Sequence, residues 1–131
     1  MIKVLKFGGT SVGSAANMKK VAEIVRREQA RITVLSAMSG TTDSLVRISR
    51  AAASGDRNAI EEQLAMLTDK YTRCIEELLR ERKQQALARM NATFGLIRDE
   101  AAAFAEYESE RKIIAQGELL TSAIFTAYLQ E

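Results

Sequence analysis

Several residue types are absent or nearly absent from this chain of 131 residues, and each absence excludes a kind of site. The chain has no histidine, so Ser-His-Asp triads, HExxH zinc sites and histidine general bases are excluded within it. The single cysteine, Cys74, cannot form an internal disulfide. The N-terminus lacks a secretory signal, and no apolar run approaches the roughly 20 residues of a membrane-spanning helix. We therefore expect a cytoplasmic protein without a membrane partner.

Charge and composition limit the partners further. Nineteen Lys and Arg residues against seventeen Asp and Glu residues leave a formal net charge of +2, and these charges are spread along the sequence. No basic segment therefore indicates binding to a nucleic acid. With 47% hydrophobic and 27% charged residues, no proline and no low-complexity linker, the sequence predicts a single globular unit.

The first part of the chain predicts a strand, a glycine-rich loop, a helix and a second strand. Residues 2–7 form an apolar run typical of a buried strand, which ends at two glycines. Ser14 should cap a helix with apolar residues at spacings of three and four, and residues 32–38 form the second strand. Such a βαβ unit has parallel strands, so the loops at 8–13 and 36–42 should open onto the same edge of the sheet.

The remainder predicts helices. Thr42 or Asp43 should cap a helix that ends near Ala53, and two longer amphipathic helices, at about 56–82 and 84–107, should pair as a hairpin. The final stretch, residues 110–131, is expected to be helical on both sides of an interruption at Gly117-Glu118. The predicted fold class is therefore α/β, with short parallel strands and a helix-rich insertion, and mostly helical by residue count.

The first loop has the composition of an anion site. Successive glycines after a strand let backbone N–H groups approach a phosphate, and Lys6, at the end of the strand, could reach its oxygens. The loop is not a Walker loop, because Ser14 stands where the lysine should follow Gly13, and the G-x-G-x-x-G pattern is also missing. The residues alone leave two alternatives: a phosphate or nucleotide site, or a tight turn beside a surface lysine.

The second loop and one later carboxylate are weaker candidates. Residues 36–42 are rich in hydroxyl groups that could bind a small polar substrate, although Ser, Thr and Asp also commonly cap helices and form turns. Glu118 lies in an apolar setting, where a buried carboxylate would need a partner or ligand, whereas an exposed one would not.

Together these motifs carry a resemblance to a known family. The stretch Lys6-Phe7-Gly8-Gly9-Thr10-Ser11-Val12 resembles the signature that opens aspartokinases, which have the amino-acid kinase fold. Two later segments, Val34–Ala37 with Gly40 and Thr42, and Gly117-Glu118 with Thr121-Ser122, are similar to that family's second loop and Gly-Glu element. The resemblance covers almost the whole chain and implies ATP-dependent phosphorylation of the L-aspartate side chain to 4-phospho-L-aspartate, the first step towards lysine, threonine and methionine.

The resemblance also implies roles for individual residues. Lys6 is the implied catalytic residue, and Lys6, Phe7, Gly8 and Gly9 would bind the ATP phosphates. Ser36, Thr42 and Glu118 would hold L-aspartate. No residue of the chain is an implied metal ligand, because the Mg²⁺ that accompanies ATP would be held mainly by the nucleotide.

By the same resemblance, residues 1–131 form only the N-terminal portion of a catalytic domain. Most of the adenosine pocket, an aspartate that organises phosphoryl transfer and the regulatory ACT domains have no counterpart here, so we expect the chain alone to be inactive and its parent enzyme to be a homo-oligomer. Two alternatives remain. One is a non-enzymatic helical interaction module built on residues 56–107, and the other is a different amino-acid kinase of the same fold.

Overall fold

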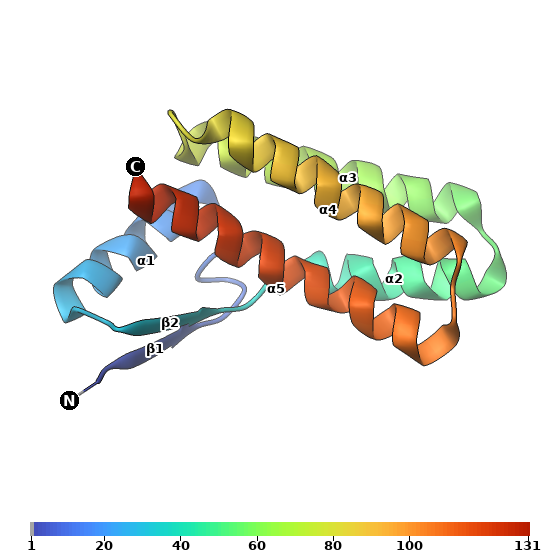
Figure 1. Cartoon of the computed structure of the whole chain (residues 1–131), viewed down its shortest axis with the longest axis horizontal. Helices are drawn as coiled ribbons and strands as arrows, with labels where there is room; N and C mark the ends of the chain where they lie inside the picture. The colour runs from blue at the N-terminus through green and yellow to red at the C-terminus, as the bar shows by residue number, and fades with distance from the viewer. Residues whose placement is uncertain (1) are drawn as a thin grey trace.

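The computed structural model describes residues 2–131, and most of them are helical (Figure 1). The fold class predicted from the sequence is confirmed: a short parallel sheet is combined with a helix-rich part. In chain order the elements are β1 (Val4–Phe7), α1 (Ala15–Glu28), β2 (Ile32–Leu35), α2 (Thr41–Ser54), α3 (Arg57–Leu78), α4 (Lys83–Ala102) and α5 (Glu106–Gln130).

The βαβ unit forms as its pattern predicts. The strands β1 and β2 are parallel, with Val4 opposite Ile32 and Phe7 opposite Leu35. The Ser14 side chain accepts a hydrogen bond from the Asn17 N–H at 3.1 Å and so caps α1, as expected.

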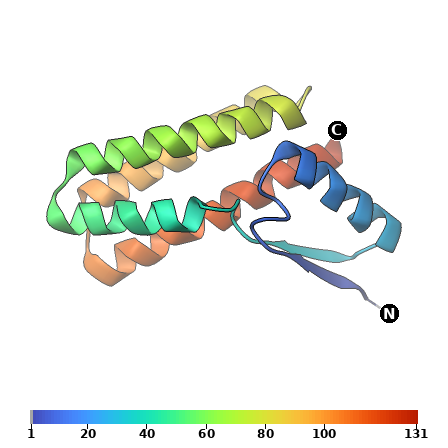
Figure 2. The ribbon, with the colours of Figure 1, turned by 180° about the vertical axis from the view of Figure 1, so that it is seen from behind.

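The prediction that the first strand is buried is wrong. Val4 is 58% exposed and Lys6 is exposed, whereas Leu5 and Phe7, which alternate with them, are half-buried. The helices cover only one face of this sheet, so the strand alternates between a covered side and an open side (Figures 1 and 2).

The second strand is shorter than predicted. It ends at Leu35, and Ser36 adds one more ladder bond by donating its N–H to the Phe7 carbonyl at 3.1 Å. Beyond that point the backbone turns towards α5, where the Met38 N–H donates to the Thr121 hydroxyl at 3.3 Å. Residues 37 and 38 therefore belong to the loop.

The helices α2 to α5 form a bundle in which each packs on its neighbours in the chain and α5 returns to α2 (Figures 1 and 2). The expected hairpin of two long helices is present as α3 and α4. Asp56 caps α3 by accepting from the Ala59 N–H at 3.1 Å. A bidentate contact of Arg98 with Glu61 at 2.7 and 3.0 Å also joins α3 to α4, and it holds the pKa of the Glu61 carboxyl below its ordinary value.

Helix boundaries differ from the predictions in several places, and α3 ends at Leu78 rather than near Arg82. The cap of α2 is Gly40, with φ +82°, and neither Thr42 nor Asp43 makes a capping bond. The helix predicted to reach Tyr107 ends at Ala102, because residues 103–105 turn the chain back into α5. The predicted interruption at Gly117-Glu118 is wrong: α5 is continuous there, and Gly117 is buried against Ala37 and against Thr41 and Leu45 of α2.

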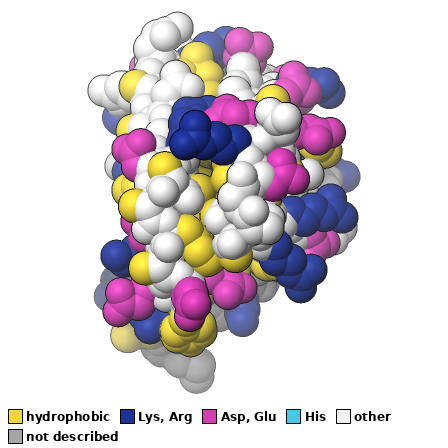
Figure 3. Space-filling model, turned by 90° about the vertical axis from the view of Figure 1, so that its right-hand side faces the viewer, with side chains coloured by type: hydrophobic (Ala, Val, Ile, Leu, Met, Phe, Trp, Pro, Cys, Tyr) yellow, Lys and Arg dark blue, Asp and Glu magenta, His cyan; other side chains and the backbone are white. Residues whose placement is uncertain are grey.

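The core lies between the bundle helices and extends under α1. Tyr71 and Phe94 meet edge to face, with ring centroids 5.9 Å apart. Lys, Arg, Asp and Glu side chains are intermixed on the end of the molecule shown in Figure 3. Within residues 2–131, none of the helices has the length and apolarity needed to span a membrane. The largest fully buried side chains are those of Tyr71, Met18, Leu45, Ile48, Leu64, Ile75, Leu79, Ile97, Ile113, Leu120, Ile124 and Val12.

Candidate functional site

Two polar loops meet at the carboxyl ends of the parallel strands, as the topology predicted. The first loop, residues 8–13, joins β1 to α1, and the second loop, residues 36–42, leads from β2 into the first turn of α2. The Ser39 N–H donates to the Gly9 carbonyl at 3.1 Å, so the loops are in direct contact. This edge is where ligands bind in open parallel α/β sheets.

The two glycines of the first loop have different surroundings. A Cβ atom on Gly9 would stand 2.9 Å from the Ala37 carbonyl oxygen and 3.3 Å from the Ser39 nitrogen. A Cβ atom on Gly8 would have nothing within 4 Å. Gly9 therefore lets the loops approach each other, whereas Gly8 leaves backbone open to an incoming group.

Lys6 lies on the open face of the sheet, beside the first loop. Its Cα pairs with that of Val34, and its side chain is exposed. Within residues 2–131 its ammonium makes no hydrogen bond or ion pair with another side chain. The adjacent Phe7 points the other way and packs against the core. An exposed cation beside glycine backbone is suited to an anionic ligand.

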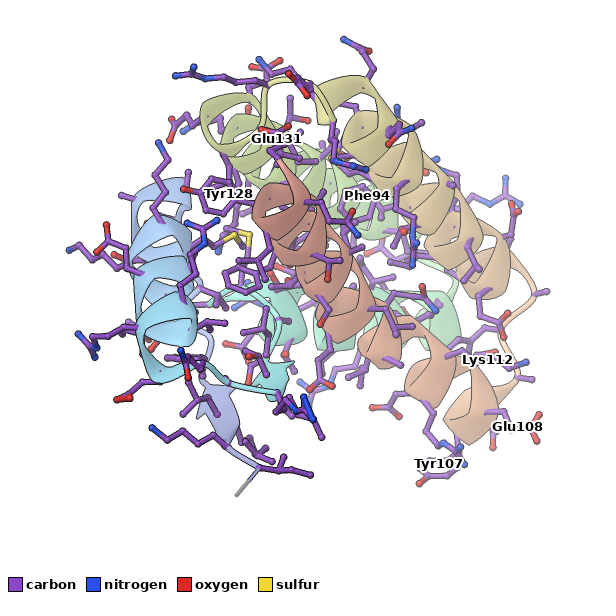
Figure 4. All side chains as sticks on the ribbon, turned by 60° about the vertical axis from the view of Figure 1, so that its left-hand side comes forward. Phe94, Tyr107, Glu108, Lys112, Tyr128 and Glu131 are labelled. Atoms are coloured by element: carbon purple, nitrogen blue, oxygen red, sulfur yellow. The ribbon has the colours of Figure 1, made fainter. Side chains whose placement is uncertain are left out.

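The three residues expected to hold a substrate lie in two places. Ser36 is half-buried at the end of β2, next to Phe7 of the first strand. Thr42, in the first turn of α2, and Glu118, on α5, are both exposed and line one groove of about 700 Å³. The structure thus brings Thr42 and Glu118 to a shared groove, and it places Ser36 with the glycine loop. The groove is also lined by Tyr107, Glu108, Glu110, Arg111, Lys112, Ile114 and Ala115, some of which appear at the start of α5 in Figure 4.

Gly117 fixes how closely α5 approaches the second loop. A Cβ atom on Gly117 would lie 3.0 Å from the Ala37 Cβ, 3.1 Å from the Thr41 Cγ2 and 3.2 Å from the Leu45 Cδ1. No side chain larger than hydrogen fits this contact without displacement. Glu118, the next residue, is therefore carried on a helix seated directly against the second loop.

A buried set of hydroxyl groups lies beneath the second loop. The Tyr71 hydroxyl, from α3, is 3.0 Å from the Thr41 hydroxyl and 3.1 Å from the Thr121 hydroxyl of α5. Thr121 also accepts the Met38 N–H. Burial raises the pKa of Tyr71, so its phenol remains protonated and keeps a donor for one of the two threonines.

Two residues at this site were not identified from the sequence. Lys70 of α3 donates to the Ser39 carbonyl of the second loop, and Tyr71 follows it. In the sequence both belong to an amphipathic helix, where Tyr71 occupies an apolar position. The sequence feature that could have identified Tyr71 is its hydroxyl group at an apolar position, because a buried tyrosine hydroxyl needs a hydrogen-bond partner.

Acidic side chains do not supply a metal site in this region. Within residues 2–131, no group of three or more Asp, Glu and Cys side chains gathers where it could hold a metal ion. The groups that the site offers a ligand include the Lys6 ammonium, open glycine backbone, hydroxyl groups and the Glu118 carboxylate.

Comparison with known proteins identifies relatives of this arrangement. The chain is 32% identical to an aspartokinase of Chlamydia muridarum over 126 residues, which are 95% of this chain and 26% of the relative. It is 34% identical to the chloroplastic aspartokinase 1 of Arabidopsis thaliana, over 96% of this chain and 23% of the relative. The chain therefore spans about a quarter of the length of these curated relatives.

A solved structure and a family model give the same result. The crystal structure of Escherichia coli aspartokinase III in complex with aspartate and ADP matches with a TM-score of 0.88 and 26% identity, over 99% of this chain and 29% of that one. The model of the amino acid kinase family matches residues 1–131. On these matches, and on the parallel strands with their paired loops, the chain belongs to the amino acid kinase family.

Proposed function

We propose that the protein carrying this chain is an aspartokinase, which transfers the γ-phosphoryl group of ATP to the side-chain carboxylate of L-aspartate. The observation that supports this most is the contact between the Lys6–Gly13 segment and the second loop at the carboxyl ends of the parallel strands. The similarity to aspartokinases, one of them solved with aspartate and ADP, supports the choice of these substrates within the family.

In this proposal the first loop and Lys6 bind the phosphates. The exposed backbone of Gly8 is open to an incoming group, and Gly8 and Gly9 offer N–H donors. Phe7 contributes backbone while its ring anchors the strand in the core. The Lys6 ammonium stabilises the negative charge that develops on the transferring phosphoryl group. ATP is the co-substrate, and the Mg²⁺ that accompanies it is held mainly by the nucleotide.

Ser36, Thr42 and Glu118 hold L-aspartate in the proposal. The Glu118 carboxylate suits the substrate ammonium, and the hydroxyl groups of Ser36 and Thr42 can bond its carboxylates. A side-chain carboxylate oxygen of aspartate then attacks the γ-phosphorus. The new O–P bond forms as the bond from that phosphorus to the β,γ-bridging oxygen breaks, which gives 4-phospho-L-aspartate and ADP. Positioning and charge neutralisation supply the catalysis, since the carboxylate is already a nucleophile.

We further propose that residues 1–131 are the N-terminal portion of the catalytic domain of a longer cytoplasmic, homo-oligomeric enzyme of lysine, threonine and methionine biosynthesis. The chain's share of its curated relatives, about a quarter, supports the part of this proposal that concerns a longer enzyme. The 131 residues alone should therefore form negligible aspartyl phosphate. Trapping with hydroxylamine tests this, because the acyl phosphate yields an aspartyl hydroxamate, which forms a coloured complex with ferric iron; robust hydroxamate formation by these residues alone would contradict it.

Substitution of Lys6 tests the proposed function in the full-length protein. We expect Lys6→Ala to lower kcat in the hydroxamate assay by about 100-fold or more, because a preorganised charge at the phosphoryl group is lost. Lys3→Ala is the matched control. Lys3 lies three residues before Lys6, but its ammonium makes an exposed ion pair with Glu28 at 3.0 Å, which contributes little.

Three outcomes would argue against the proposal. Equal activity of Lys6→Ala and wild type would remove Lys6 from catalysis. If the wild-type protein binds ATP in calorimetry but does not bind L-aspartate, the result would favour the interpretation that it is another amino-acid kinase. A protein that binds neither ligand would favour the helical interaction module.

A further inference from the structure

The second loop is held from below by side chains that lie too deep to touch a ligand. Tyr71 is fully buried on α3, and Thr121 is fully buried on α5. We propose that the hydroxyl groups of Tyr71 and Thr121 are positioning groups for the second loop and set the affinity of the enzyme for L-aspartate. This inference rests on the proposed function and extends it to residues beyond the substrate contacts.

The hydrogen bonds form a continuous path through three elements. Thr41, the first residue of α2, is 3.0 Å from the Tyr71 hydroxyl, which is 3.1 Å from the Thr121 hydroxyl. Thr121 in turn accepts the N–H of Met38 at 3.3 Å. The path therefore forms hydrogen bonds with the second loop at two points, Met38 and Thr41, which lie on either side of the Ser39–Gly40 turn.

These two points lie directly beside the proposed substrate contacts. Ser36 is two residues before Met38, and Thr42 follows Thr41. Glu118 lies three residues before Thr121, about one turn along the same helix. Loss of the hydroxyl path would therefore disturb the spacing of Thr42 and Glu118 across their shared groove.

Breaking this path of hydrogen bonds would also cost free energy. Met38 is buried, and a buried N–H without a partner is costly. If Thr121 loses its oxygen, the Met38 N–H loses the acceptor that lies 3.3 Å away, and only the neighbouring Tyr71 hydroxyl, which also bonds the Met38 backbone, or a water molecule can replace that acceptor. A side chain of the same volume cannot replace the hydrogen bond, because the Met38 N–H is satisfied by the hydroxyl oxygen of Thr121.

The decisive variants remove oxygen atoms while keeping volume. In the full-length enzyme, we expect Thr121→Val and Tyr71→Phe each to raise the KM for L-aspartate about five- to tenfold, with the KM for ATP within about twofold of wild type. Thr121→Ser, which keeps the hydroxyl, should restore the aspartate KM. Amide exchange of the Met38 N–H should quicken in Thr121→Val and not in Thr121→Ser.

Tyr128→Phe is the matched control for loss of a phenol oxygen. Tyr128 is placed between α5 and α1, with Arg26 5.9 Å from its ring centroid (Figure 4). Its hydroxyl makes no hydrogen bond with another of residues 2–131. We therefore expect Tyr128→Phe to leave both KM values unchanged.

The results separate the inference from the function on which it rests. If wild type is active and Thr121→Val and Tyr71→Phe keep the wild-type aspartate KM, the inference is wrong and the function stands. A lower kcat and melting temperature with an unchanged aspartate KM would equally overturn it, since that is a purely structural role. If wild type forms no aspartyl phosphate, the proposed function is wrong and the inference falls with it. Should Tyr71→Phe fail to fold, the comparison of Thr121→Val with Thr121→Ser still decides.

Discussion

Gly8 and Gly9 are neighbours in one turn, yet only Gly9 lacks space for a side chain. Neither has a positive φ, so an alanine can adopt the backbone conformation of both positions. The difference lies in the Ala37 carbonyl oxygen, 2.9 Å from where a Cβ atom on Gly9 would stand. Backbone oxygen cannot rotate away as a side chain can, so the two loops must separate to admit a methyl group.

We therefore expect Gly9→Ala to lower the free energy of unfolding by about 1–3 kcal/mol and Gly8→Ala to change it by less than about 1 kcal/mol. Urea unfolding of the two variants beside wild type measures both values. Equal effects of the two substitutions would mean that the loops are not packed as described.

This asymmetry marks the limit of what the sequence predicts at the scale of residues. The glycine pair and Lys6 are visible as an anion-binding pattern, because the pattern is local. Which of the two glycines lacks space for a Cβ atom depends on Ala37 and Ser39, and these residues belong to the second loop. The role of Tyr71 is hidden for the same reason, since its partners lie on α2 and α5.

At the scale of elements, two glycines in helices give opposite expectations. Gly95, in α4, has nothing within 4 Å of the position that a Cβ atom would take, whereas that position on Gly117 of α5 lies 3.0 Å from the Ala37 Cβ. Alanine favours a helix over glycine by about 1 kcal/mol at either site. Only at Gly117 does a collision with buried atoms oppose this gain.

Gly95→Ala should therefore stabilise the protein by about 0.5–1 kcal/mol, and Gly117→Ala should destabilise it by roughly 1–2 kcal/mol. Thermal unfolding of both variants tests the signs. The contact with Ala37 would be refuted by a Gly117→Ala variant at least as stable as wild type.

The same contact explains why the interruption predicted in α5 does not occur. Glycine is a poor helix former, so the Gly117-Glu118 pair predicts a break when the segment is considered alone. In the structure, Gly117 allows α5 to pack closely on the second loop and α2, and this packing keeps the helix continuous. Local propensity was outweighed by tertiary contacts, which the sequence pattern does not show.

At the scale of the whole molecule, the sheet is covered on one side only. The sequence predicted the strand order, the parallel pairing and the mostly helical composition, because apolar runs that end at glycine loops and apolar spacings of three and four are strong local signals. It wrongly predicted that residues 2–7 are buried, since a short apolar run does not reveal how many layers cover it. The open face carries Ile2, Val4, Ile32 and Val34, each between 44% and 63% exposed.

Two neighbours in β2 test this one-sided cover directly. Val34, on the open face, is 44% exposed, and Leu35, on the covered face, is 6% exposed and packs in the core. In the 131-residue chain, Leu35→Ala should cost about 2–5 kcal/mol of unfolding free energy, because it leaves a cavity, whereas Val34→Ala should cost less than about 1 kcal/mol. Chemical denaturation at several protein concentrations measures both costs. A cost for Val34→Ala that approaches that of Leu35→Ala would show that the open face is buried in solution, and a dependence of that cost on concentration would identify a second copy of the chain as its cover.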